Sequence, residues 1–156
     1  MKELLVREWM HTAVVAINPE LRLERAWETM ERQRIRHLPV VKQERLVGIV
    51  TQRDLKRAVF GNPPTPTVWK EGKPQPTGTP GDLPVEAVMT QEVYTAKPTD
   101  TLLSAALCMR TAKISALPVV DETKKLVGIL TQTDLLSALI ALLQNPEEQP
   151  SPCRFA

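Results

Sequence analysis

The feature that most constrains the fold of this chain is an internal duplication. The sequence LPVV occurs at 38–41 and again at 117–120, and a near-identical stretch follows each copy, LVGIVTQRDL in the first and LVGILTQTDL in the second. Upstream of LPVV, a shift of 79 positions aligns Val6 with Val85 and Met10 with Met89. Self-similarity over so long a stretch indicates a duplicated folding unit, and two copies are too few for a solenoid. We therefore expect a closed pair of repeats related by a pseudo-twofold axis.

Each copy carries the same order of secondary-structure signals. In the first copy, apolar residues at helical spacing between 23 and 30 predict an amphipathic helix, which an extended run around 13–17 precedes. The apolar runs 38–41 and 46–50, on either side of a polar turn, predict a strand hairpin. Thr51 then opens a second helix. The sequence therefore predicts an α+β fold of tandem β-α-β-β-α repeats packed sheet to sheet.

The two copies are separated by a segment rich in helix- and strand-breaking residues. The stretch 61–82 contains six prolines and four glycines, which argue against regular structure. We expect repeat 1 at 1–60, a linker at 61–82, repeat 2 at 83–144 and a frayed tail at 145–156. An alternative function for the linker is a strap that docks a partner through Trp69.

Composition limits the environment and the partners of the chain. Cys108 and Cys153 fit no metal or disulfide spacing, which favours a reducing compartment. The longest late apolar run, 135–143, is too short to span a bilayer, and charged residues interrupt the N-terminus before a signal-peptide core is reached. We therefore expect a cytoplasmic protein with no membrane partner.

Charge alone argues against nucleic acid as the main partner, because the net charge is only +2. The first copy nevertheless concentrates basic residues, so nucleic-acid binding stays open as an alternative, with a steep loss of affinity in salt as its mark. These residues are Arg32, Arg34, Arg36, Arg45, Arg53, Lys56 and Arg57.

The repeated motif allows two interpretations. Thr51 with Asp54, and Thr131 with Asp134, fit the helix capping box, in which the side chains and backbone N–H groups of the first turn satisfy one another. A helix N-terminus also favours a bound phosphate, and a carboxylate there can accept hydrogen bonds from both hydroxyls of a ribose. Gly48, just upstream, allows another group to approach the backbone closely. Capping and ligand binding can share the same residues.

The doubled pattern of LPVV followed by LVGIVTQRDL or LVGILTQTDL resembles the paired cystathionine β-synthase domain, or CBS domain. The resemblance covers both repeats. It implies two β-α-β-β-α units packed sheet to sheet with two clefts between them, and modules that dimerise into a disc. It also implies adenosine-containing regulatory ligands, such as AMP, ADP, ATP or S-adenosylmethionine.

The resemblance also implies roles for individual residues. It assigns the ribose to Asp54 and Asp134, with Thr51 and Thr131 assisting. Arg36, His37 and Arg53 stand where the family places phosphate-binding groups, whereas the second copy has Ser115, Ala116 and Thr133 there. The two clefts are therefore expected to be unequal, with Asp134, His37 and Arg53 serving one and Asp54 with Arg36 the other. The resemblance places the adenine near the segment from Ile35 to Pro39 in the first copy, and near Ser115, Ala116 and Pro118 in the second.

The sequence contains no catalytic or metal-binding motif, so we expect no enzymatic activity, no metal and no required cofactor. His11, at the entry to the first extended segment, is expected to be structural. The predicted function is a regulatory, energy-sensing homodimer that binds an adenine nucleotide and signals through its dimer shape or an unknown target protein. The alternative is a dimerisation or docking scaffold that binds no small molecule.

Overall fold

A computed structural model of the chain describes residues 3–60, 67–70, 73–76 and 78–144. Within each repeat, a helix precedes a strand hairpin and a second helix follows it, which confirms the predicted fold class. The first repeat has α1 (Leu23–Gln33), β1 (His37–Lys42), β2 (Arg45–Thr51) and α2 (Gln52–Phe60). The second has α3 (Leu102–Ala112), β5 (Ala116–Val120), β6 (Leu126–Thr131) and α4 (Gln132–Leu143).

The two hairpins repeat each other in register. Val40 pairs with Gly48 in β1–β2, and Val119 pairs with Gly128 in β5–β6; both ladders shift immediately after that valine. The strands are short apolar runs rich in β-branched residues, as a pleated, half-buried surface requires. The duplication of sequence is therefore a duplication of structure down to the irregularity in the ladder.

The extended run expected around 13–17 forms much less sheet than predicted. Ile17 makes one parallel bridge to Val40, and Ala96 makes the equivalent bridge to Val119. Ala13, Val14 and Val15 line a cleft instead of extending the ladder. The first strand of each repeat is thus reduced to a single pair because the chain before it faces the cleft.

The N-terminal part of each repeat packs on the other repeat. The Val6 N–H donates to the Asp100 carbonyl at 2.8 Å, and the Val85 N–H donates to the Leu21 carbonyl at 2.8 Å. Both valines are fully buried, Val6 in the core of the second repeat and Val85 in the core of the first. These exchanged segments contain the 3-10 turns η1 (Val6–Glu8) and η3 (Val85–Ala87).

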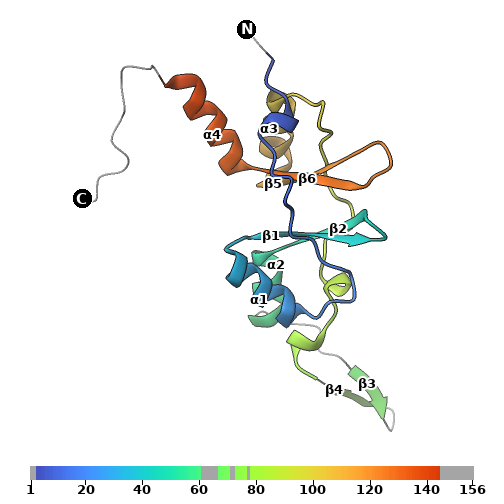
Figure 1. Cartoon of the computed structure of the whole chain (residues 1–156). Coiled ribbons are helices and arrows are strands. Elements are labelled where there is room, and N and C mark those ends of the chain that lie inside the picture. Colours follow the sequence, from blue (N-terminus) through green and yellow to red (C-terminus); the bar gives the residue numbers. More distant parts are fainter. Residues whose placement is uncertain (1–2, 61–66, 71–72, 77, 145–156) are drawn as a thin grey trace, which may run out of the picture.

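The linker contains regular structure that its composition does not predict. A hairpin of β3 (Thr67–Lys70) and β4 (Lys73–Pro76) stands apart from both repeats, and the 3-10 turn η2 (Pro80–Asp82) follows it (Figure 1). The expectation of an irregular linker is therefore wrong for these segments. In a two-stranded sheet both strands are edges, which tolerate the missing N–H groups of prolines. The expected frayed tail, 145–156, lies outside the described residues.

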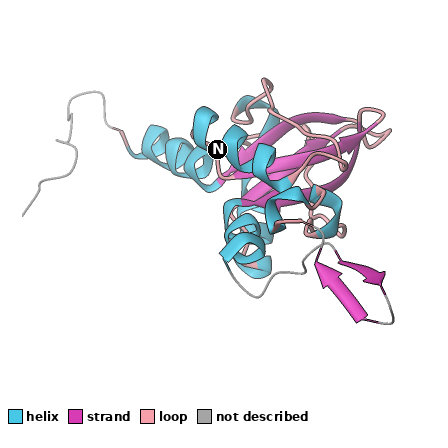
Figure 2. Ribbon diagram, turned by 90° about the horizontal axis from the view of Figure 1, so that it is seen from below, coloured by secondary structure: helices cyan, strands magenta, loops and turns pink. Residues whose placement is uncertain are grey.

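The β1–β2 and β5–β6 hairpins lie against each other at the centre, with α1 and α2 on one side and α3 and α4 on the other (Figure 1). Figure 2 shows the strands of both hairpins together, and β3–β4 well away from them. The hairpin turns are joined by a symmetric pair of hydrogen bonds, from the Leu46 N–H to the Lys124 carbonyl at 3.1 Å and from the Leu126 N–H to the Glu44 carbonyl at 3.2 Å. In the described part of the chain, no helix combines the length and apolar character needed to cross a bilayer.

Candidate functional site

Two clefts lie between the repeats, and they are built from equivalent positions. The Asp54 cleft, of about 760 Å³, is formed by the start of α2 and by the segments that enter and leave α3. The Asp134 cleft, of about 630 Å³, is formed by the start of α4 and by the corresponding segments around α1. Both volumes suit a nucleotide-sized ligand. Each cleft therefore takes its carboxylate from one repeat and its opposite wall from the other.

The motif aspartates cap their helices as the sequence predicts. Oδ2 of Asp54 accepts hydrogen bonds from the Thr51 N–H at 2.8 Å and the Thr51 hydroxyl at 2.7 Å. Oδ2 of Asp134 accepts from the Thr131 N–H and hydroxyl, both at 2.7 Å. Each cap thus uses one carboxylate oxygen. Among the hydrogen bonds and ion pairs of the described residues, none involves Oδ1 of Asp54.

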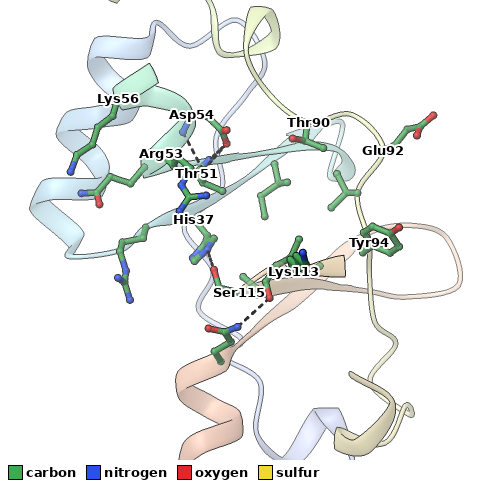
Figure 3. Close-up of a pocket in the computed structure, with 17 residues that line it drawn as sticks. His37, Thr51, Arg53, Asp54, Lys56, Thr90, Glu92, Tyr94, Lys113 and Ser115 are labelled. Carbon is green, nitrogen blue, oxygen red and sulfur yellow. Dashed lines mark hydrogen bonds between the residues drawn. The ribbon is translucent and has the colours of Figure 1, made fainter. Parts of the chain in front are cut away.

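The Asp54 cleft is the more cationic of the two. Arg53 and Lys56 on α2 and Lys113 after α3 line it together with Arg36 (Figure 3). In the Asp134 cleft, the positions equivalent to Arg53 and Lys56 hold Thr133 and Leu136. The expected grouping of Arg53 with Asp134 is therefore wrong, because Arg53 stays beside its sequence neighbour Asp54. Arg36 lines both clefts.

The Asp134 cleft contains an ion-pair geometry that the sequence does not reveal. Nε2 of His11 lies 2.9 Å from Oδ1 of Asp134, whose side chain is only 9% exposed, while that of His11 is 68% exposed. His11 was expected to be a structural residue at a strand entry, yet it lies in the cleft wall. The pairing joins residues more than a hundred positions apart, so local patterns could not predict it.

His37 lies between the clefts and lines both. Its Nε2 is 2.8 Å from Oγ of Ser115, so the pair joins the two repeats near their axis (Figure 3). Burial and the neighbouring Arg36 guanidinium lower the pKa of His37, and the carboxylate of Asp54 opposes them only in part. His37 is therefore a neutral hydrogen-bonding group at pH 7 rather than the cation that the sequence suggested.

The adenine-side candidates divide between cleft wall and core. Ser115 lines both clefts, and Ala116 lines the Asp54 cleft. Pro39 and Pro118 are buried inside β1 and β5 and are not among the residues that line either cleft. Both prolines are buried within their strands, whereas residues shortly before them, such as His37 and Ser115, line the clefts.

The structure adds wall residues that sequence reasoning missed. Tyr94 and Glu92 line the Asp54 cleft from the segment before α3, and the Tyr94 ring is exposed (Figure 3). The repeat alignment could have drawn attention to Tyr94, because the equivalent position in the first copy is Val15 in the Asp134 cleft. In the described part of the chain, no group of three or more His, Cys, Asp or Glu side chains is arranged to hold a metal ion.

Comparisons with known proteins identify the family. Residues 6–61 and 85–141 each match the CBS domain. A CBS domain-containing protein of Dictyostelium discoideum is 31% identical over 143 residues, which cover 91% of this chain and 95% of that protein. An uncharacterized protein of Methanocaldococcus jannaschii, MJ1225, is 35% identical over 135 residues; the match covers 85% of this chain but 46% of that protein.

A solved structure extends the comparison to three dimensions. The CBS domain pair of protein MJ0100, in complex with 5'-methylthioadenosine and S-adenosyl-L-methionine, superposes with a TM-score of 0.75 at 25% identity. The match covers 90% of this chain and 99% of that one. With two matched repeats, equivalent clefts and the same fold, the chain belongs to the CBS domain family.

Proposed function

We propose that this chain is a regulatory module that binds adenosine-containing ligands in its two inter-repeat clefts, and that the Asp54 cleft takes the phosphorylated ones, AMP, ADP or ATP. One observation carries the proposal: the cleft combines a carboxylate oxygen left open by its helix cap with four cationic side chains, Arg36, Arg53, Lys56 and Lys113. Such a combination fits a ribose joined to a phosphate.

The chemistry of each part of the ligand has a matching group in the Asp54 cleft. The Asp54 carboxylate can accept hydrogen bonds from the ribose hydroxyls. Arg53 stands at the positive N-terminal end of α2, where a phosphate is favoured, and Lys56 lines the cleft from the next turn of the helix. The exposed ring of Tyr94 and the apolar side chain of Ile114 offer a face to the adenine.

The Asp134 cleft suits a ligand with less negative charge. Leu136, Val14 and Val15 line it, and Thr133 replaces the arginine of the other cleft. The MJ0100 pair, which is similar in sequence and fold, binds methylthioadenosine and S-adenosylmethionine, neither of which carries a phosphate. We therefore propose this second class of ligand for the Asp134 cleft.

Regulation requires the ligand to bind two conformations with different affinity. A ligand in either cleft contacts both repeats, so its binding favours one packing of the repeats over another. The output of this module is a change in dimer shape or in affinity for a target protein.

Thermal unfolding with adenosine, AMP, ADP, ATP, S-adenosylmethionine and methylthioadenosine tests the proposal. A ligand at a hundred times its Kd should stabilise the protein by about 2.7 kcal/mol and raise Tm by about 5 to 10 °C. The variant Arg53→Thr, which takes the residue of the equivalent position in the other repeat, should weaken AMP binding about tenfold and leave adenosine binding unchanged. Equal losses for AMP and adenosine would remove the phosphate role, and no shift with any compound would overturn ligand binding.

One observation favours an interaction role beside ligand binding. The second repeat exposes large apolar side chains on both of its helices, and α4 has one charged residue, Asp134, at its very start. We propose that a second copy of the chain covers this face to form the homodimer, because a largely apolar face is compatible with a copy of itself. The side chains are Leu103 and Leu107 on α3 and Leu136, Leu139, Ile140, Leu142 and Leu143 on α4.

A further inference from the structure

His11 and Thr90 occupy equivalent positions on equivalent backbones. The His11 N–H donates to the Ile129 carbonyl at 2.9 Å, and the Ile129 N–H donates to the His11 carbonyl at 2.9 Å. Thr90 and Ile49 exchange the same two hydrogen bonds at 2.9 and 3.0 Å. Since the backbone frame is the same, the difference between the two clefts at this point lies in the side chain.

The side chain at this position determines whether Oδ1 of the motif aspartate in the same cleft has a partner within the protein. In the Asp134 cleft, the cap uses Oδ2, and His11 lies 2.9 Å from Oδ1. In the Asp54 cleft, the cap uses Oδ2 in the same way, and within the described residues Oδ1 has no hydrogen-bond or ion-pair partner. One cleft therefore presents an available carboxylate oxygen, and the other presents one already bound by the protein itself.

A ribose diol at Asp134 must compete with this internal partner. The Asp134 side chain is almost completely buried, so it cannot turn to offer another approach to its carboxylate. His11 is mostly exposed, so its imidazole can rotate away while its backbone hydrogen bonds to Ile129 stay intact. The competition costs the ligand a charge-assisted hydrogen bond but does not require the fold to open.

We propose that His11 is a specificity-determining residue that acts as a latch on the Asp134 cleft, occupying the oxygen that a ligand diol needs. The inference rests on the proposed binding of adenosine compounds between the repeats. The latch lowers the affinity of the Asp134 cleft, so a ligand that both clefts accept, such as adenosine, fills the Asp54 cleft first and the Asp134 cleft only at higher concentration. Two clefts of one duplicated design thereby respond to different concentration ranges.

Calorimetric titration with adenosine tests the latch, because adenosine carries the diol but no phosphate, and the difference in cationic side chains then matters least. The Asp54→Asn variant leaves the carboxylate of the Asp134 cleft as the one intact motif carboxylate. Adding His11→Thr to this variant should raise the affinity for adenosine about tenfold, because the ligand no longer competes with one charge-assisted hydrogen bond. The reciprocal change, Thr90→His in an Asp134→Asn background, should lower the affinity of the Asp54 cleft by a similar factor.

The outcomes separate the latch from the proposed function. Adenosine binding that His11→Thr leaves unchanged or weakens overturns the latch, the second result making His11 a ligand contact, while the proposed function stands. Absence of binding of adenosine and of AMP to the parent protein and to every variant overturns the proposed function and the latch together. Circular-dichroism melting of each variant without ligand checks that the fold is kept. His11→Thr and Thr90→His each introduce the residue found at the equivalent position of the other repeat.

Discussion

His37 is neutral rather than positively charged because of its burial and its neighbours. Its position before LPVV suggests a phosphate-binding cation, but burial and Arg36 lower its pKa, and Ser115 holds its ring. A protonated His37 would have to form in a partly buried site beside another positive charge. The residue therefore serves the contact between the repeats, and the positively charged side chains that line the Asp54 cleft are Arg36, Arg53, Lys56 and Lys113.

This lowered pKa predicts a pH dependence of stability. Because the folded state binds the His37 proton less readily than the unfolded state, the free energy of unfolding should be highest above the ordinary histidine range and should fall as the pH drops through it. The variant His37→Gln should lose less stability than the parent between pH 7.5 and 5.5, as measured by denaturant unfolding. His11 is present in both proteins and cancels in the comparison. Equal pH slopes would show that His37 does not contribute to this dependence.

At the scale of elements, a glycine in each hairpin accepts the exchanged segment of the other repeat. A Cβ added at Gly48 would lie 2.5 Å from Sδ of Met89, and one added at Gly128 would lie 2.6 Å from Sδ of Met10. The sequence predicted a close approach at the first of these positions, and the approaching group is a methionine. The glycines therefore allow the two repeats to pack strand against segment.

Substitution of this glycine should destabilise the protein. Gly48→Ala forces Met89 out of its place and should cost roughly 1 to 3 kcal/mol, as overpacking of a core does. The cost should shrink in a Met89→Ala background, which a double-mutant cycle from chemical denaturation would measure. Gly81→Ala is the matched control, because its Cβ would lie 3.4 Å from Cβ of Glu24 and needs little adjustment. The same cost in both Met89 backgrounds would contradict the proposed contact.

At the scale of the whole molecule, the two repeats share a fold but differ in their outer surfaces. Glu24 and Glu28 on α1 stand where α3 has Leu103 and Leu107, and all four side chains are exposed. The pseudo-twofold axis therefore relates a polar helical face to an apolar one. A dimer that uses the apolar face would place the second repeats of two chains together.

The double variant Leu103→Glu with Leu107→Glu tests this arrangement. It gives α3 the residues of α1 at equivalent positions, so the helix should still form, while four glutamates would meet in the dimer. We expect a dimer for the parent and a monomer for the variant in light scattering coupled to size-exclusion chromatography. Adenosine binding should persist, because neither leucine lines a cleft. A variant that stays dimeric would place the interface elsewhere.

Much of each repeat could be predicted because its signals are local. The hairpins follow from β-branched runs around a polar turn, and the caps follow from a threonine and an aspartate three residues apart. The β3–β4 hairpin was missed because prolines argue against strands in general, although edge strands admit them. The first strand was overpredicted because an extended segment can line a cleft as well as join a sheet.

The duplication, the order of elements and the inequality of the two copies follow from the amino-acid sequence alone, since aligned positions with different residues cannot build identical clefts. The tertiary structure decided which residues share a cleft. The N-terminal segment of each repeat packs on the other repeat, held by hydrogen bonds such as that from the Val6 N–H to the Asp100 carbonyl. This packing places His11 beside Asp134 and Thr90 in the wall of the Asp54 cleft. Which segment faces which carboxylate depends on how two repeats pack across their axis. That packing is set by contacts between residues distant in the chain, which the periodicity of either repeat alone does not contain.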